Sequence, residues 1–220
     1  MLRAAGIGVG DEVVVPAFGN VEVAEAVTLA GALPVFADID PVSYCLDPTA
    51  VEAAVTHRTA AVVAVHRFGR PADLVRLHAL GHRLGLLVLE QGESEAPYDE
   101  IAQRRQRAGY LDARLKGVRT PEGAVGHTYQ QYVVRVPGNG RPDRDAFART
   151  VRAKGVDARV PVKTPVHRLP GFRQCVSLPE TERAADETLA LPVDASLTKR
   201  EMQRIVAACN ALGGLLQPAF

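Results

Sequence analysis

The first ninety residues alternate short apolar runs with helix-like stretches. Asp47 followed by Pro48 is typical of a helix start, and Gly31 is typical of a helix end. Continuous apolar strands between helices predict a parallel sheet covered on both faces, which is an α/β fold. The predicted strands cover residues 12–16, 33–39, 60–66 and 86–90, and the predicted helices cover residues 21–30, 47–56 and 72–84.

The pattern changes after Pro97, where a long charged helix is predicted. Thr198 and Glu201 have capping-box spacing at the start of a last helix. Strands and helices here do not repeat the earlier alternation, so we expect a small α+β domain. The predicted elements are helices at 98–115, 142–154 and 198–212 and strands at 129–136 and 156–160. We therefore expect a partial parallel-sheet domain at 1–96, a linking helix at 97–118 and a C-terminal α+β domain at 119–220.

Composition excludes several classes of function. The chain has 220 residues, of which 47% are hydrophobic and 23% charged, with a formal net charge of +1. It is too apolar for a disordered tail and too evenly charged for a nucleic-acid binder. The apolar runs are shorter than the ~20 residues of a membrane span, and the first residues lack a secretory pattern. We expect a cytoplasmic protein without a membrane or nucleic-acid partner.

Cysteine and lysine are both scarce. Three cysteines, without CxxC or Cys/His spacing, predict neither a metal site nor a disulfide framework. Arginine far outnumbers lysine, which limits the amines available for covalent chemistry. The three cysteines are Cys45, Cys175 and Cys209, and the four lysines are Lys116, Lys154, Lys163 and Lys199.

Several stretches in order along the chain carry a family resemblance. They are residues 6–17, 30–41, 66–73, 132–136, 165–170 and 188–192, followed by Leu197 and Thr198. Together they resemble the DegT/DnrJ/StrS family of pyridoxal-phosphate (PLP)-dependent nucleotide-sugar aminotransferases. The resemblance implies part of the large parallel-sheet domain of a fold-type-I aminotransferase, plus its small C-terminal α+β domain.

The same resemblance predicts that parts of the cofactor site are missing. The chain lacks the family's N-terminal Ser-Gly-Thr turn, and residues 90–96 run directly into the linking helix, which skips the Schiff-base lysine. Gln91 stands where the family has the acid that contacts the pyridine nitrogen, and Asn20 stands where it has a stacking aromatic. PLP chemistry needs both a lysine amine and that acid. We therefore expect no bound cofactor.

Polar residues at predicted strand ends are candidates for catalysis. Glu90 and Glu93 follow one strand of the parallel sheet, and His66 ends the preceding one. Open α/β sheets bind ligands at this edge, and a histidine beside a carboxylate can transfer protons. Because Glu90 and Gln91 alternate in direction, we expect His66 to meet Glu90 or Glu93, but not both. The alternative is that these groups only fill space or face solvent.

A second candidate site lies in the proline-rich stretch near residue 165. Arg159, Lys163 and His167 surround a segment that resembles the family's nucleotide-sugar site. Cations bind phosphate oxygens well, so these residues could contact a diphosphate. The alternative is a solvated basic rim.

Three hypotheses about function follow. The first is a degenerate, non-catalytic partner in nucleotide-sugar or antibiotic biosynthesis. Exposed sheet edges would then drive homo-oligomerisation or association with an intact aminotransferase paralogue, since the family's sites form at dimer interfaces. The second is a cofactor-independent enzyme that uses His66 and the strand-end acids on a nucleotide sugar or another small molecule. The third is a residual PLP-dependent aminotransferase.

Overall fold

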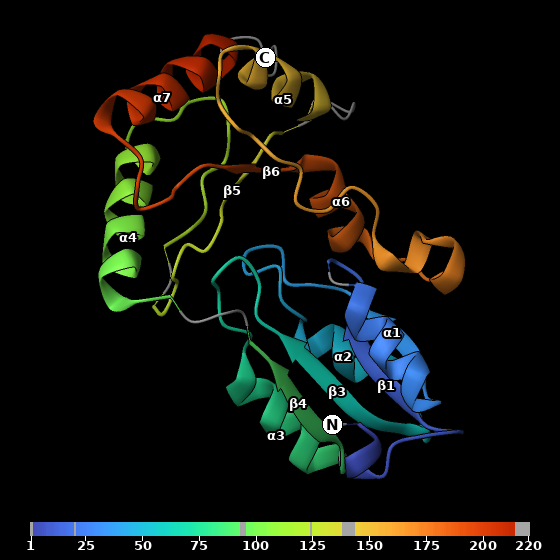
Figure 1. Cartoon of the computed structure of the whole chain (residues 1–220). Coiled ribbons are helices and arrows are strands. Elements are labelled where there is room, and N and C mark those ends of the chain that lie inside the picture. The colour runs from blue at the N-terminus through green and yellow to red at the C-terminus, as the bar shows by residue number, and fades with distance from the viewer. Residues whose placement is uncertain (1, 20, 93–95, 124, 138–143, 214–220) are drawn as a thin grey trace. The chain divides into compact units, whose positions relative to one another are not determined.

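The computed structural model describes two compact units of the chain (Figure 1). Unit 1 comprises residues 1–67, 71–93 and 164–183, and unit 2 comprises residues 68–70, 94–163 and 184–220. The residues described are 2–19, 21–92, 96–123, 125–137 and 144–213.

Unit 1 is built on a four-stranded sheet in the order β2-β1-β3-β4. Every neighbouring pair is parallel, so the predicted parallel α/β sheet is confirmed. β4 is the last strand on one side and β2 the last on the other. The strands are β1 (Glu12–Pro16), β2 (Leu33–Ala37), β3 (Thr59–Val65) and β4 (Leu87–Gln91).

Both faces of this sheet are covered because alternate residues of its central strands point to opposite sides. In β1, Val13 and Val15 pack with Val27 of α1, while Val14 packs with Val51 of α2 and with residues of α3. Two hydrophobic cores therefore lie on either side of β1 and β3. The helices of this part are α1 (Val21–Ala30), α2 (Pro48–Ala54), α3 (Leu74–Leu84) and the 3₁₀ turn η1 (Arg3–Ala5).

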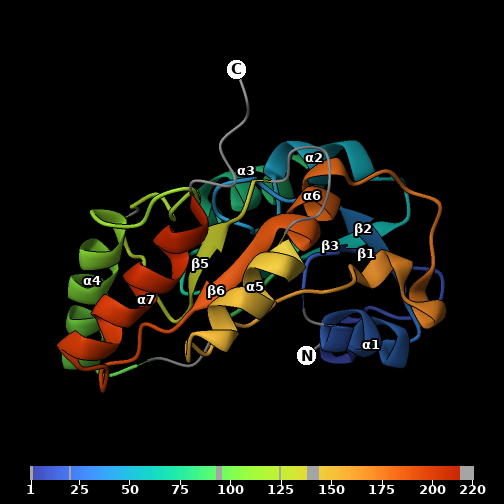
Figure 2. The same cartoon turned by 90° about the horizontal axis from the view of Figure 1, so that it is seen from above.

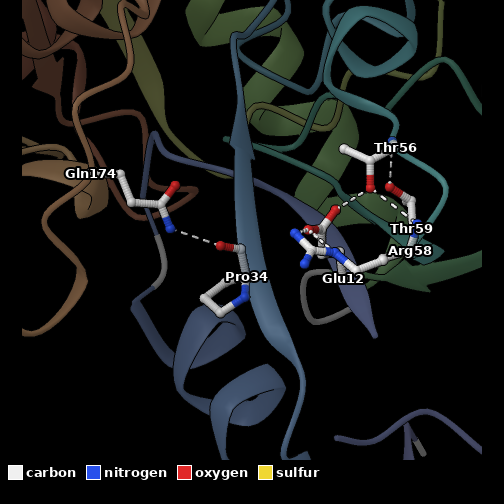
Figure 3. Close-up of polar contacts among 6 residues, drawn as sticks. All are labelled: Glu12, Pro34, Thr56, Arg58, Thr59 and Gln174. Atoms are coloured by element: carbon white, nitrogen blue, oxygen red, sulfur yellow. Dashed lines mark hydrogen bonds and ion pairs between the residues drawn. The ribbon is translucent and has the colours of Figure 1, made fainter. Parts of the chain in front are cut away.

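The helix ends follow the predicted local chemistry. The Asp47 carboxylate accepts a hydrogen bond from the Thr49 N–H at 3.0 Å, and Pro48 is the first helical residue of α2. At the amino end of β1, buried Glu12 accepts hydrogen bonds from Thr56 and Arg58 (Figure 3). These bonds, that from Thr56 above all, hold the pKa of Glu12 below its usual range.

The segment 164–183 belongs to unit 1 and not to the predicted C-terminal domain 119–220. It contains the 3₁₀ turns η2 (Val166–Arg168) and η3 (Pro170–Phe172). The Gln174 amide donates a hydrogen bond to the Pro34 carbonyl of β2 at 2.8 Å (Figure 3), and the Val166 N–H donates to the Ala17 carbonyl at 2.8 Å. These bonds join residues 140 or more positions apart, which is why the sequence pattern did not predict them.

Unit 2 is an α+β unit, as predicted, around the antiparallel pair β5–β6. Single bridges extend the pair on both sides, Arg119 to Arg135 and Arg159 to Ala190. One hydrophobic core joins the strands to α4, α5 and α7, and α5 and α7 run beside β6 (Figure 2). The elements are β5 (Tyr132–Arg135), β6 (Thr188–Leu191), α4 (Tyr98–Asp112), α5 (Arg144–Ala153), α6 (Pro179–Glu187) and α7 (Lys199–Gly213). The division between the units falls within α6.

None of the helices in the described ranges combines the length and apolarity that crossing a membrane requires.

Candidate functional site

The carboxyl ends of β1, β3 and β4 form the edge at which a parallel sheet usually binds ligands. The strand order reverses direction between β1 and β3, so this pair is the switch point of the sheet. His66 directly follows β3, and Glu90 and Gln91 end β4. The structure thus places the predicted strand-end residues that it describes on neighbouring strands.

His66 and Glu90 form a hydrogen-bonded pair. The Nε2 atom of His66 lies 2.7 Å from Oε1 of Glu90, and the Ala72 N–H donates to Nδ1 of the same ring at 2.9 Å. Since Nδ1 accepts, the ring carries its proton on Nε2 and donates it to Glu90. His66 therefore orients the carboxylate, and the Glu90 side chain, 49% exposed, remains open to a ligand.

The other strand-end candidates are Glu93, Asn20 and Gln91. Glu93 and Asn20 lie outside the described residues. Gln91 is exposed, and its backbone carbonyl accepts the His66 N–H at 3.1 Å, which continues the β3–β4 ladder. His66 thus contacts Glu90, one of the two acids expected for it, while the expectation that it does not also meet Glu93 stays a prediction.

The predicted cationic cluster is not assembled within either unit. Arg159 and Lys163 are exposed residues of unit 2, whereas His167 is a buried residue of unit 1. The His167 ring packs near Phe36, and its Nε2 lies 3.3 Å from Oε1 of Glu182. His167 is therefore a core histidine with a carboxylate partner rather than an accessible phosphate ligand.

A cavity of ≈ 360 Å³ lies beside Arg159, entirely within unit 2. The Arg159 guanidinium donates through Nε and Nη2 to Oδ2 of Asp157, at 3.0 and 2.5 Å. Arg159 was expected here as a phosphate ligand, whereas its acidic neighbours Asp157 and Asp194 were not among the predicted site residues, because carboxylates do not bind phosphate. The cavity is lined by Gln130, Gln131, Asp157, Arg159, Val160, Pro161, Ala190, Leu191, Pro192, Val193 and Asp194.

Among the described residues, no group of three or more His, Cys, Asp and Glu side chains is arranged to hold a metal ion. Cys45 and Cys209 are both buried, and burial raises the pKa of the Cys209 thiol to about 12. Cys209 is therefore a packed thiol and not a nucleophile at neutral pH.

Comparison with known proteins identifies the family pattern over almost the whole chain. The model of the DegT/DnrJ/EryC1/StrS aminotransferase family matches residues 1–92 and 98–210. The match confirms the resemblance seen in the motifs. It breaks at residues 93–97, where the sequence analysis placed the skipped part of the family pattern.

Individual relatives are similar over different lengths. The pleiotropic regulatory protein of Geobacillus stearothermophilus is 28% identical over 299 residues, which cover 93% of this chain and 79% of the relative. Since 93% of 220 residues cannot fill 299 positions, that alignment contains long gaps on this chain's side. The L-glutamine:2-deoxy-scyllo-inosose aminotransferase of Streptomyces lividus is 38% identical over 160 residues, 72% of this chain but only 35% of the relative.

A third relative is similar over a shorter stretch. The UDP-N-acetyl-3-dehydro-alpha-D-glucosamine 3-aminotransferase of Acidithiobacillus ferrooxidans is 48% identical over 89 residues, 40% of this chain and 24% of the relative. The matched parts of these two aminotransferases are therefore well under half of their length.

Solved structures confirm the fold. A DegT DnrJ EryC1 StrS aminotransferase from Brucella abortus superposes with a TM-score of 0.87 at 22% identity, over 97% of this chain and 82% of that chain. The ntda protein of Bacillus subtilis, solved with bound cofactor PMP (pyridoxamine phosphate), gives 0.86 at 18% identity, over 97% and 70%. The predicted partial fold-type-I aminotransferase architecture is thus the observed one.

The expectation that the chain has no cofactor is wrong. The matching family is one of aminotransferases, and similar solved structures hold PMP or a ketimine intermediate. The described residues nevertheless do not fit a cofactor linked to a lysine of unit 1, because unit 1 contains no lysine. All four lysines are exposed residues of unit 2. The group therefore enters none of the chemistry proposed for this chain.

Proposed function

Because the chain belongs to the DegT/DnrJ/EryC1/StrS aminotransferase family, we propose that it acts as an accessory subunit in amino-sugar or aminocyclitol biosynthesis. Its partner in this proposal is a full-length aminotransferase of the same family, which carries out the amino transfer. The curated relatives that support this setting are named as aminotransferases of scyllo-inosose compounds and of nucleotide sugars.

The observation that carries the accessory role is the edge of the sheet at β4. β4 ends the sheet, and the family match breaks directly after it. Leu87 of β4 is 40% exposed and Leu84 at the end of α3 is 38% exposed, so apolar surface adjoins the edge. At the opposite edge, Gln174 hydrogen-bonds to β2. A strand edge with exposed apolar neighbours is a template for pairing with another chain.

A charge placed on this edge should weaken the association. We expect the tagged chain, co-expressed with a full-length aminotransferase of the family from the same genome, to copurify and sediment as a heteromer. Leu87→Lys should weaken that complex roughly tenfold, because the lysine must be desolvated at the interface. Val75→Lys is the matched control, since Val75 is 82% exposed on α3.

Two results would contradict the accessory role. One is a stable monomer that ignores the aminotransferase at micromolar concentration. The other is a complex that Leu87→Lys and Val75→Lys weaken equally, which would place the interface elsewhere.

The hydrogen bond between His66 and Glu90 favours a second candidate function, a cofactor-independent proton transfer next to a ketone. Glu90 would be the base, oriented by His66, whose Nδ1 is occupied by the Ala72 N–H. A positioned base of this kind contributes typically 10²- to 10⁴-fold to a rate.

This second function predicts solvent exchange. With 2-deoxy-scyllo-inosose in D₂O and no added cofactor, the protein should accelerate deuterium uptake at the carbon beside the carbonyl. Glu90→Gln should slow the exchange at least about tenfold, and Glu25→Gln, on an exposed position of α1, should not. Exchange at the uncatalysed rate with the unaltered protein would remove this function.

A further inference from the structure

We infer that the cavity beside Arg159 binds an uncharged or amino-bearing polyol ring, such as a cyclitol, in preference to a sugar carried on a nucleotide diphosphate. The inference rests on the proposed role in amino-sugar or aminocyclitol biosynthesis and names the ligand class of this site. It also replaces the diphosphate contact expected for Arg159 with a different assignment.

Three chain segments of unit 2 converge to form the site. Gln130 and Gln131 precede β5, residues 157–161 run alongside β6 through the Arg159–Ala190 bridge, and residues 190–194 continue from the end of β6. Each segment contributes at least one polar side chain. The volume of ≈ 360 Å³ falls in the range of small-molecule sites, which begins at roughly 300 Å³.

The charges of the cavity disfavour a phosphate. Arg159 is the one cation among the lining residues that the structure describes, and it donates two hydrogen bonds to the Asp157 carboxylate. Those bonds, and to a lesser extent the charge of Asp194, raise the pKa of Arg159 above its ordinary value. With two carboxylates against one guanidinium, these described lining residues carry one net negative charge. A diphosphate would meet like charge there, and the guanidinium charge that would attract it is already shared with Asp157.

The same groups suit hydroxyl and ammonium groups. Both bonds from Arg159 end on Oδ2 of Asp157, so this pair does not consume Oδ1, the other carboxylate oxygen. Asp194 is exposed, and neither of these two hydrogen bonds from Arg159 ends on it. Carboxylates and the amides of Gln130 and Gln131 can accept and donate to ring hydroxyls, and a carboxylate forms a charge-assisted bond with an ammonium.

The rest of the lining supplies an apolar surface. Val160, Pro161, Leu191, Pro192 and Val193 bring aliphatic groups to the cavity. A cyclitol ring has C–H groups between its hydroxyls and can rest on such a surface while its rim is hydrogen-bonded. Apolar walls with a few polar groups are the usual composition of a ligand site.

Direct binding measurements test this assignment. We would titrate the full chain, without any aminotransferase, with scyllo-inosamine, scyllo-inositol and UDP-N-acetylglucosamine, and follow the backbone amide shifts of residues 157–161 and 190–194. We expect the amine to bind with a Kd of about 1 mM, several-fold more tightly than the neutral ring, and the nucleotide sugar to bind most weakly. Asp194→Asn should weaken the amine roughly fivefold and the neutral ring less than twofold.

Asp186→Asn, on an exposed position of unit 2 away from the cavity, is the matched control and should change nothing. Circular dichroism checks that the variants fold. Tightest binding by the nucleotide sugar, no binding by either ring, or equal loss in Asp194→Asn and Asp186→Asn would overturn the assignment. Because no partner is present, these outcomes are independent of the accessory role, which the sedimentation experiment tests separately.

Discussion

Acidification from pH 6.5 to pH 4.5 should cost this protein a large part of its stability, and His127 is the expected cause. His127 is 2% exposed in unit 2, and its ring stacks on Tyr129 with centroids 3.8 Å apart. Burial, followed by the positive charge of Arg70, lowers the pKa of His127 to about 4. The neighbouring Arg105 donates to the His127 carbonyl and adds a further positive charge beside the ring.

The direction of the effect follows from proton linkage. Well above pH 6.5 the histidine is neutral in both states and contributes no pH dependence. Between pH 6.5 and about 4 the unfolded chain binds a proton that the folded chain excludes, so the free energy of unfolding falls as the pH falls. A pKa difference of about 2.5 between the two states corresponds to about 3 kcal/mol of unfolding free energy. Most of this free energy is lost before the pH has fallen to 4.5.

Urea unfolding followed by far-UV circular dichroism between pH 4.5 and 7 measures this slope. The carboxyl groups with lowered pKa, such as Glu12 and Asp157, lose their contributions mainly below this window. His127→Gln should flatten the slope, whereas His82→Gln, at an exposed position of α3, should leave it unchanged. If His127→Gln does not fold, the ring proton shifts of His127 decide the matter, and a titration midpoint near pH 6.5 would contradict the assignment.

Local chemistry explains why most elements of the fold could be predicted. The strand Glu12–Pro16 and the helix Val21–Ala30 have the predicted bounds, because an apolar run and a helix-forming stretch are each encoded by adjacent residues. Thr198 and Glu201 form the expected capping box, with hydrogen bonds of 2.8 and 3.3 Å. In contrast, the predicted strand 156–160 is a single bridge at Arg159, because strand length depends on a partner elsewhere in the chain.

The candidate sites, like the elements of the fold, could be predicted from the sequence only in part. His66 and Glu90 were predictable as neighbours, since consecutive parallel strands bring their carboxyl ends together. The burial of His167 could not be predicted, because its partner Glu182 lies on α6, a helix that the sequence pattern did not reveal. The pairing of Arg159 with Asp157 could have been foreseen, since residues two apart in an extended segment share one face.

The carboxylate of Asp38 fixes the start of α6 to the parallel sheet within unit 1. Asp38 directly follows β2, and it accepts hydrogen bonds from the N–H groups of Thr181 at 2.8 Å and Glu180 at 3.0 Å. These donors are among the four that a helix start leaves without partners, and the negative charge also suits the positive end of the helix dipole. A residue 142 positions away in sequence thus caps this helix.

Removing that carboxylate should loosen residues 164–183 before the rest of unit 1. Asp38→Ala removes the acceptor of three backbone N–H groups, those of Ile39, Glu180 and the fully buried Thr181, and should cost about 2 kcal/mol. Asp38→Asn retains an acceptor oxygen and should cost less.

Hydrogen exchange measures this loosening directly. In Asp38→Ala, the N–H of Val166, which bonds to Ala17, should lose protection, while the N–H groups of the β1–β3 ladder should keep theirs. Glu25→Ala on exposed α1 is the control. Equal protection of Val166 in Asp38→Ala and the unaltered chain would mean that the apolar contacts of Val166 and Leu178, rather than Asp38, hold this segment on the sheet.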